Sequence, residues 1–193
     1  MKKIGLTGSI GMGKTTVSAI FKKYGIPVYS ADEAVHALYK NPSVVALIEK
    51  AFPYSTKEGM VDRQVLTRYF VDNPNNIDRL NKIIHPLVRN CEDEFLELAR
   101  MRGEKMVVLD VPLLFETKSH ERMDVVIVVS APFAVQKERV LARPFMNEDK
   151  FKIILSQQMD DEEKRKRADF VVDTAGDLGY TEKQVKEWLR DNL

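Results

Sequence analysis

The fold is decided by one stretch near the start of the chain, Gly8-Ser9-Ile10-Gly11-Met12-Gly13-Lys14-Thr15. It matches the pattern G-x-x-x-x-G-K-[S/T], in which a glycine-rich loop joins a strand to a helix. The short apolar run 4–7 predicts the strand, and helical apolar spacing over 15–23 predicts the helix. The pattern in this context indicates a phosphate-binding loop (P-loop) rather than an ordinary glycine-rich turn.

The chemistry expected of this loop is nucleotide binding. Its backbone N–H groups can surround phosphate oxygens, and the following helix adds positive potential at its first turn. We expect Lys14 to reach the β- and γ-phosphates, Thr15 to bind a bridging Mg²⁺, and Thr16 to lie near the α-phosphate. The predicted nucleotide-binding residues are Gly11, Met12, Gly13, Lys14, Thr15 and Thr16.

A P-loop alone does not separate kinases, GTPases and motor ATPases, so the rest of the chain must decide. No N-K-x-D motif for guanine is present, and Asp173-Thr174-Ala175-Gly176 imitates a GTPase switch element too late in the chain. A length of 193 residues leaves no room for the coupling domains of a motor. A small kinase remains.

The order of the expected elements predicts an α/β fold with a parallel sheet flanked by helices, as in P-loop NTPases. Further strands are expected over 27–29, 106–111, 124–130 and 170–172. Helices without any strand are expected over 32–40, 43–52, 62–71, 75–84 and 86–102, with prolines between them. Later helices are expected over 132–143, over 147–167 and from 181 onward. The helical block reads as an insertion into a single domain spanning 1–193.

Composition excludes several classes of protein. The net charge is +1, from 30 basic and 29 acidic residues, which gives no indication of a nucleic-acid partner. No apolar run is long enough for a signal peptide or a membrane span, so a cytoplasmic protein is expected. A single cysteine, Cys91, excludes an intrachain disulfide and reads as inert packing. The charged run 160–167 reads as a solvated helix face.

Two aspartates end predicted strands near the phosphate site. Asp32 follows the second strand, where a carboxylate could accept the proton of an attacking hydroxyl; a first-turn or capping aspartate is the alternative. Asp110 ends a buried apolar strand, as in a Walker B motif that helps hold Mg²⁺; a strand-end turn residue is the alternative.

Two further groups could contact substrates. His85 and Arg89 lie four residues apart near an expected helix start, although a lone histidine is usually structural. Gln136, Arg139 and Arg143 share one helical face, and small kinases need mobile arginines over the transferred phosphoryl group.

Seven segments together resemble the dephospho-CoA kinase family along essentially the whole chain. They are KIGLTGSIGMGKTTV (3–17), YSADEAVH (29–36), IIHPLVR (83–89), VVLDVPLLFE (107–116), DVVIVVSAP (124–132), QKERVLAR (136–143) and ADFVVDTAG (168–176). Only the first is generic to P-loop proteins. Ser9 and Met12 replace the family's usual glycine and serine, but at variable positions of the loop.

The resemblance implies a core of about 1–31 and 104–193, a helical substrate-binding insertion of about 32–103 and a lid of about 138–160. It also implies that Asp32 is the base for a ribose 3′-hydroxyl, that His85 and Arg89 contact the acceptor, and that Arg139 and Arg143 act from the lid. The expected enzyme transfers the γ-phosphoryl group of ATP to dephospho-CoA with Mg²⁺, the last step of coenzyme A biosynthesis, without nucleic-acid or membrane partners; its oligomeric state stays open. The alternatives are another small-molecule kinase, acting on a nucleoside, nucleotide or shikimate-like alcohol, and a non-catalytic ATP-sensing module.

Overall fold

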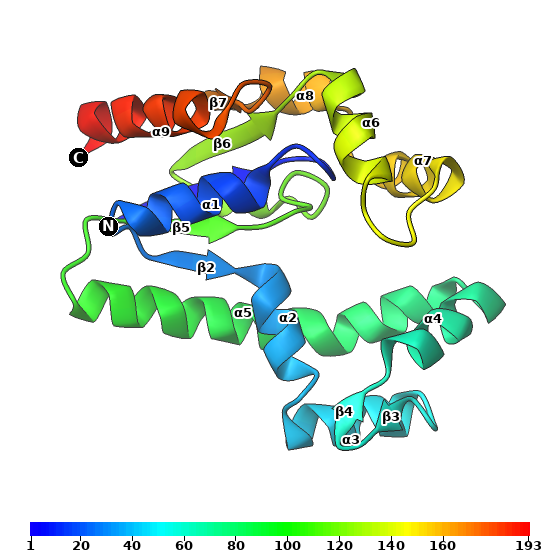
Figure 1. The fold of residues 1–193 in the computed structure, drawn as a ribbon. Coiled ribbons are helices and arrows are strands. Elements are labelled where there is room, and N and C mark those ends of the chain that lie inside the picture. The colour runs from blue at the N-terminus through cyan, green and yellow to red at the C-terminus, as the bar shows by residue number, and fades with distance from the viewer. The chain divides into compact units, whose positions relative to one another are not determined.

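Five strands form one sheet in the order β2-β5-β1-β6-β7 in the computed structural model, which describes all 193 residues (Figure 1). The strands are β1 (Lys2–Thr7), β2 (Val28–Ser30), β5 (Met106–Asp110), β6 (Val125–Ser130) and β7 (Phe170–Asp173). β1 pairs in parallel with β5 on one side and with β6 on the other, and β6 pairs in parallel with β7. The predicted α/β fold with a parallel sheet is confirmed.

The position of β1 determines where a ligand can bind. In an open parallel sheet, ligands bind beyond the carboxyl ends of the strands, where consecutive connections leave to opposite sides. β1 lies at that point because its two neighbours, β5 and β6, occupy opposite sides of it. The loop that leaves β1 is the P-loop, and it leads into α1 (Lys14–Lys23).

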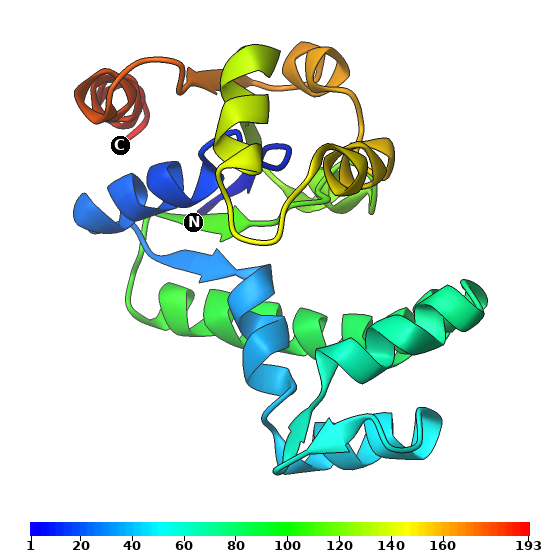
Figure 2. The same cartoon turned by 45° about the vertical axis from the view of Figure 1, so that its right-hand side comes forward.

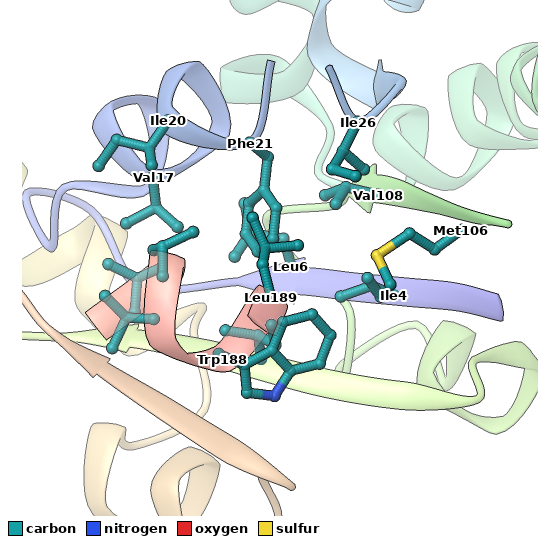
Figure 3. Packing of buried hydrophobic residues seen from close by; sticks show 14 of the residues in the cluster. Ile4, Leu6, Val17, Ile20, Phe21, Ile26, Met106, Val108, Trp188 and Leu189 are labelled. Carbon is teal, nitrogen blue, oxygen red and sulfur yellow. The ribbon is translucent and has the colours of Figure 1, made fainter. Parts of the chain in front are cut away.

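One face of the sheet packs against α1 and α9 (Leu178–Asn192). Figure 3 shows side chains of α1 and α9 meeting over this face, and Phe21 contacts Trp188 edge-on with 6.2 Å between ring centroids. Alternate residues of each strand supply the other half of this core, as expected for strands buried on both faces. They include Ile4, Leu6, Met106, Val108, Ile127 and Val129.

The opposite face is covered by the segment that follows β5. Leu114 and Phe115 from this segment pack against Val126 and Val128 of β6. The segment has no long helix and contains only a short 3₁₀ turn over Ser119–Arg122.

The chain divides into two compact units. The first comprises Met1–Tyr29 and Ala99–Leu193 and contains the sheet; the second comprises Ser30–Leu98. The second unit is built from α2 (Ala31–Leu38), α3 (Pro42–Ala51), α4 (Arg63–Asp72) and most of α5 (Asn75–Met101). Its core includes Leu38, Val44, Ile48, Phe52, Leu66, Leu80 and Ile84. None of the helices in the chain combines the length and the apolar character that crossing a membrane requires.

Two expectations about the second unit were wrong. α5 runs through Pro86 without a break, because the exposed proline leaves the apolar stripe of the helix intact: Ile84 before it and Cys91 after it belong to the same core. A two-stranded hairpin of β3 (Thr56–Lys57) and β4 (Met60–Val61) also interrupts the expected all-helical block. Its turn uses Glu58 and Gly59, both at positive φ, as tight hairpin turns require.

The last third of the chain departs from expectation at three places. The helix expected over 147–167 is two helices, α7 (Glu148–Ser156) and α8 (Asp161–Lys166), because Asp160 caps a new helix with its carboxylate. α9 begins at Leu178, before the expected Thr181, because Asp177 caps it. Most of the charged run 160–167 is exposed, but Asp161 is half-buried and accepts a hydrogen bond from the Ser130 hydroxyl at 2.6 Å, and the side chain of Lys164 is fully buried.

Candidate active site

An ion pair joins the P-loop helix to the sheet at the centre of the candidate site. The ammonium group of Lys14, in the first turn of α1, lies against the carboxylate of Asp110, the last residue of β5. Ser18 lies one turn further along α1 and donates to the other oxygen of Asp110 at 2.5 Å. The structure therefore brings together two predicted site residues, Lys14 and Asp110.

The P-loop is folded so that backbone amides are available. Gly11 and Gly13 have φ of 80° and 90°, which side chains rarely tolerate, and a Cβ at Gly11 would lie 2.5 Å from Val140. The N–H groups of both glycines make no hydrogen bond within the protein, and Thr15 and Thr16 are exposed in the first turn of α1. Met12 differs, because its N–H donates to the carbonyl of Ser9 at 3.1 Å.

Polar side chains hold the same loop from outside. Ile10 accepts a hydrogen bond from Gln136 at 2.8 Å and donates one to Gln158 at 3.1 Å. The carbonyl of Met12 accepts from the Thr174 hydroxyl at 2.7 Å. These contacts hold the loop from both sides.

The two predicted lid arginines have different surroundings. Arg139, on α6 (Phe133–Leu141), donates to the hydroxyl and the carbonyl oxygen of Thr174, at 3.0 and 2.6 Å. Arg143 lies just beyond α6; its guanidinium is exposed and has no hydrogen bond or ion pair. Figure 2 shows α6 and α7 at the same end of the sheet as the P-loop. Arg139 is thus held against the loop that follows β7, whereas Arg143 is exposed and has no partner.

The predicted magnesium ligands are Thr15 and Asp110. Both offer oxygen, the donor that Mg²⁺ prefers, and Mg²⁺ needs only one or two protein ligands because phosphate and water complete its shell. The exposed hydroxyl of Thr15 fits this role. Asp110 fits it once Lys14 has turned from the carboxylate to the phosphates.

The second unit carries a groove of about 890 Å³ between α2 and α4. Asp32 lines it from the first turn of α2, and its carboxylate makes no hydrogen bond or ion pair. The cap of α2 is Ser30, whose hydroxyl accepts from the N–H of Glu33 at 3.2 Å. Asp32 is therefore not the capping residue of this helix.

Positive charge lines the same groove. Arg63, the first residue of α4, lies over the ring of Tyr39 at 5.4 Å and within 3.3 Å of His36 Nδ1. Lys40 also lines the groove, with an apolar floor that includes Leu66 and Phe70. An anionic ligand with an apolar portion would match this lining.

His85 and Arg89 do not line this groove. Both are exposed on α5, spaced by four residues and hence on one face, and neither forms a hydrogen bond or an ion pair. His85 and Arg89 could contact a ligand bound in the groove only if that ligand extended from the groove along α5.

Three residues that contact the candidate site were not identified from the sequence: Ser18, Gln158 and Lys164. Ser18 could have been found, because it is a polar residue among apolar core positions one turn after Lys14. Gln158 and Lys164 could not have been found from the sequence, because each contacts a residue far away along the chain. Gln158 lies 148 positions from Ile10, and Lys164 lies 155 positions from Ser9.

Comparison with known proteins shows which family the chain belongs to. The family model for dephospho-CoA kinase matches residues 2–179. The dephospho-CoA kinase of Bartonella quintana (strain Toulouse) is 52% identical over 185 residues, covering 96% of this chain and 95% of the relative. Among solved structures, TT1252 from Thermus thermophilus superposes with a TM-score of 0.87 at 31% identity, covering 100% and 97% of the two chains. The dephospho-CoA kinase from Campylobacter jejuni superposes with a TM-score of 0.73 at 26% identity, covering 100% and 98%. With a nearly full-length match to the family and a P-loop whose lysine meets a strand-end aspartate, this chain belongs to the dephospho-CoA kinase family.

Proposed function

We propose that this protein transfers the γ-phosphoryl group of ATP to the 3′-hydroxyl of dephospho-CoA, forming CoA and ADP. The observation that carries the proposal is the P-loop itself, with free amides at Gly11 and Gly13 and with Lys14 beside Asp110. Family membership narrows the acceptor to dephospho-CoA.

The nucleotide half of the reaction is assigned to the first unit. The free amides of the P-loop bind the β-phosphate, and Lys14 neutralises the charge that grows on the β–γ bridge as the bond breaks. Arg143, which is exposed and unpaired, stabilises the transferred phosphoryl group, while Arg139 contacts the nucleotide from its place beside Thr174. A bound Mg²⁺, held by Thr15 and Asp110, would add charge neutralisation at the phosphates.

The proton is assigned to Asp32. The 3′-oxygen of the acceptor forms a bond to the γ-phosphorus, the bond from that phosphorus to the β–γ bridging oxygen breaks, and the hydroxyl proton passes to the Asp32 carboxylate. An unpaired carboxylate is suited to this task, because no other hydrogen bond must break first.

The acceptor is assigned to the groove between α2 and α4. Dephospho-CoA carries a diphosphate and a long, weakly polar arm. Arg63 and Lys40 offer charge to the diphosphate, and Leu66 and Phe70 offer apolar surface to the arm. His85 and Arg89 on α5 provide a second contact for the same acceptor.

The test measures ADP release in a coupled assay with dephospho-CoA as the acceptor. The product is then analysed by mass spectrometry. We expect steady turnover that depends on dephospho-CoA and yields a product carrying one additional phosphate on the 3′-oxygen. Faster phosphorylation of adenosine, a nucleoside monophosphate or shikimate would refute the acceptor assignment. No ATP consumption with any acceptor would favour an ATP-sensing module instead.

A further inference from the structure

Lys164 is the one fully buried charged residue of the charged run 160–167, which the sequence predicts to be a solvated helix face. It lies on α8, and its side chain has an exposed fraction of 0%. Lys166, two residues later, is 58% exposed and pairs with Glu162 and Glu163 on the surface. A lysine is almost never fully buried unless its ammonium group is paired, so its partners matter.

Those partners are two segments of the nucleotide site. The ammonium group lies 3.0 Å from the carboxylate of Glu116, in the segment that follows β5 and Asp110. It also donates to the hydroxyl of Ser9, within the P-loop, at 3.3 Å. Lys164 thus joins the segment after the Asp110 strand to the first half of the loop that surrounds the phosphates.

Glu116 is held as an ion by its surroundings. Burial alone would raise the pKa of its carboxyl group, but the N–H of Met159 at 2.7 Å and the ammonium of Lys164 more than offset this and leave the pKa below its ordinary value. Its second oxygen is buried without a partner. Removing Lys164 alone would therefore leave a largely unpaired carboxylate under the P-loop.

Ser9 transmits this contact to the loop. Its carbonyl accepts from the N–H of Met12, which closes the turn, and the next residue, Ile10, is held by Gln136 and Gln158. Amides that are fixed before the ligand arrives bind it more tightly, because no ordering cost is incurred on binding.

We propose that Lys164 is a positioning residue for nucleotide binding, which fixes the P-loop through Ser9 and couples it to the segment after β5 through Glu116. The proposal rests on the proposed function, since it takes MgATP as the ligand. It predicts that the contribution of Lys164 to ATP affinity is separate from its contribution to stability.

The experiment compares Lys164→Met, Glu116→Gln and the double variant with the parental protein, using titration with MgATP and thermal unfolding. Lys164→Met keeps the length of the side chain but removes its charge. We expect the Kd for MgATP to rise about tenfold or more through lost preorganisation, while the KM for the acceptor stays within about twofold. The matched control is Lys166→Met, which removes an exposed lysine from the same helix and should change neither Kd nor Tm.

The double variant separates positioning from stability. Lys164→Met should lower the Tm because it leaves the buried Glu116 carboxylate without its charged partner. Adding Glu116→Gln should restore much of the Tm, because the unpaired charge is then removed. We expect the Kd to stay raised in the double variant. A double variant that regains both Tm and parental Kd would make Lys164 merely structural and overturn the proposal, as would Lys164→Met with a parental Kd. Parental protein that bound no MgATP would overturn the proposed function as well, so the two failures are distinguishable.

Discussion

Lys14 and Asp110 form an ion pair that the proposed ligands would have to rearrange. A carboxylate taken out of water is costly unless its oxygens are satisfied, and here Lys14 satisfies one and Ser18 the other. In the proposed roles, phosphates entering the loop would compete with Asp110 for Lys14, and a metal ion would take the place of Lys14 at the carboxylate. The ion pair therefore keeps Lys14 at the site without committing it to a single partner.

Lys14→Ala is expected to lower kcat at least ~10²-fold, because it removes the charge that balances the developing negative charge on the β–γ bridge. The measurement is kcat with dephospho-CoA, alongside circular dichroism to verify the fold. The control is Lys23→Ala in the last turn of the same helix, a lysine whose side chain is 63% exposed and pairs with Glu182. Turnover of the Lys14 variant within a few-fold of the parent would remove the P-loop lysine from the mechanism.

Asp32→Asn is expected to lower kcat by ~10²- to 10⁴-fold with little change in ATP affinity, because an amide cannot accept the proton. Kinetics combined with MgATP titration measure the two effects separately. The control is Ser30→Ala, which removes the actual cap of α2 and should cost about 1 kcal/mol of stability while leaving the base in place. Loss of MgATP binding in the Asp32 variant would instead indicate a role at the metal ion.

Residues of the candidate site could be proposed from sequence where a motif fixes their spacing. Lys14, Thr15 and Thr16 follow from the P-loop pattern, and Asp110 follows from an apolar run that ends in a carboxylate. Lys164 was missed because its neighbours are charged and only tertiary packing buries it. A pattern along the chain cannot show which member of a charged run turns inward.

At the scale of elements, α5 shows why a proline is an uncertain boundary. Proline removes one backbone hydrogen bond and favours an extended residue before it, so a break at Pro86 was the natural expectation. The apolar stripe of α5 continues across it, and burial of Leu80, Ile84 and Leu87 in one core outweighs the lost bond. The hairpin of β3 and β4 was missed for a different reason, since two-residue strands are too short to show alternation.

The groove between α2 and α4 leads to a prediction at the same scale. Arg63→Ala should raise the KM for dephospho-CoA about tenfold or more with little effect on the KM for ATP, because a charge-assisted contact to the acceptor diphosphate is lost. His85→Ala and Arg89→Ala should act in the same direction if the acceptor extends along α5. Steady-state kinetics with each substrate varied in turn provide the measurement.

The matched control for the groove is Arg68→Ala, an exposed arginine of α4 that does not line it. An equal rise in both KM values for Arg63→Ala would mean that the groove does not form the acceptor site. Unchanged acceptor KM in Arg63→Ala, with a raised value in Arg89→Ala, would place the acceptor on α5 alone.

At the scale of the whole molecule, the order of the elements could be predicted well from the sequence, because the apolar runs, the P-loop motif and the strand-poor stretch all indicate the same fold. Continuous apolar runs mark β5 and β6, a P-loop follows β1, and a long strand-poor stretch marks the helical block. Boundaries set by capping side chains, such as those at Asp160 and Asp177, were harder to place because aspartate is also common on helix surfaces.

Division into two units predicts that the two substrates protect different parts of the chain from hydrogen exchange. The proposed roles assign ATP to Met1–Tyr29 with Ala99–Leu193, and the acceptor to Ser30–Leu98. A bound ligand slows local opening where it binds, so MgADP should slow exchange in the P-loop and α1, and dephospho-CoA should slow it in α2 and α4. Exchange measured by mass spectrometry on peptides from each unit provides the readout.

The Lys14→Ala and Arg63→Ala variants turn this comparison into a test of the assignment itself. Lys14→Ala should weaken protection by MgADP and leave protection by dephospho-CoA unchanged, while Arg63→Ala should do the reverse. The physical reason is that each side chain contacts one ligand only in the proposed roles, so the loss of affinity is confined to that ligand. Protection of α2 and α4 by MgADP alone, abolished by Arg63→Ala, would instead assign the groove to the nucleotide and require a different acceptor site.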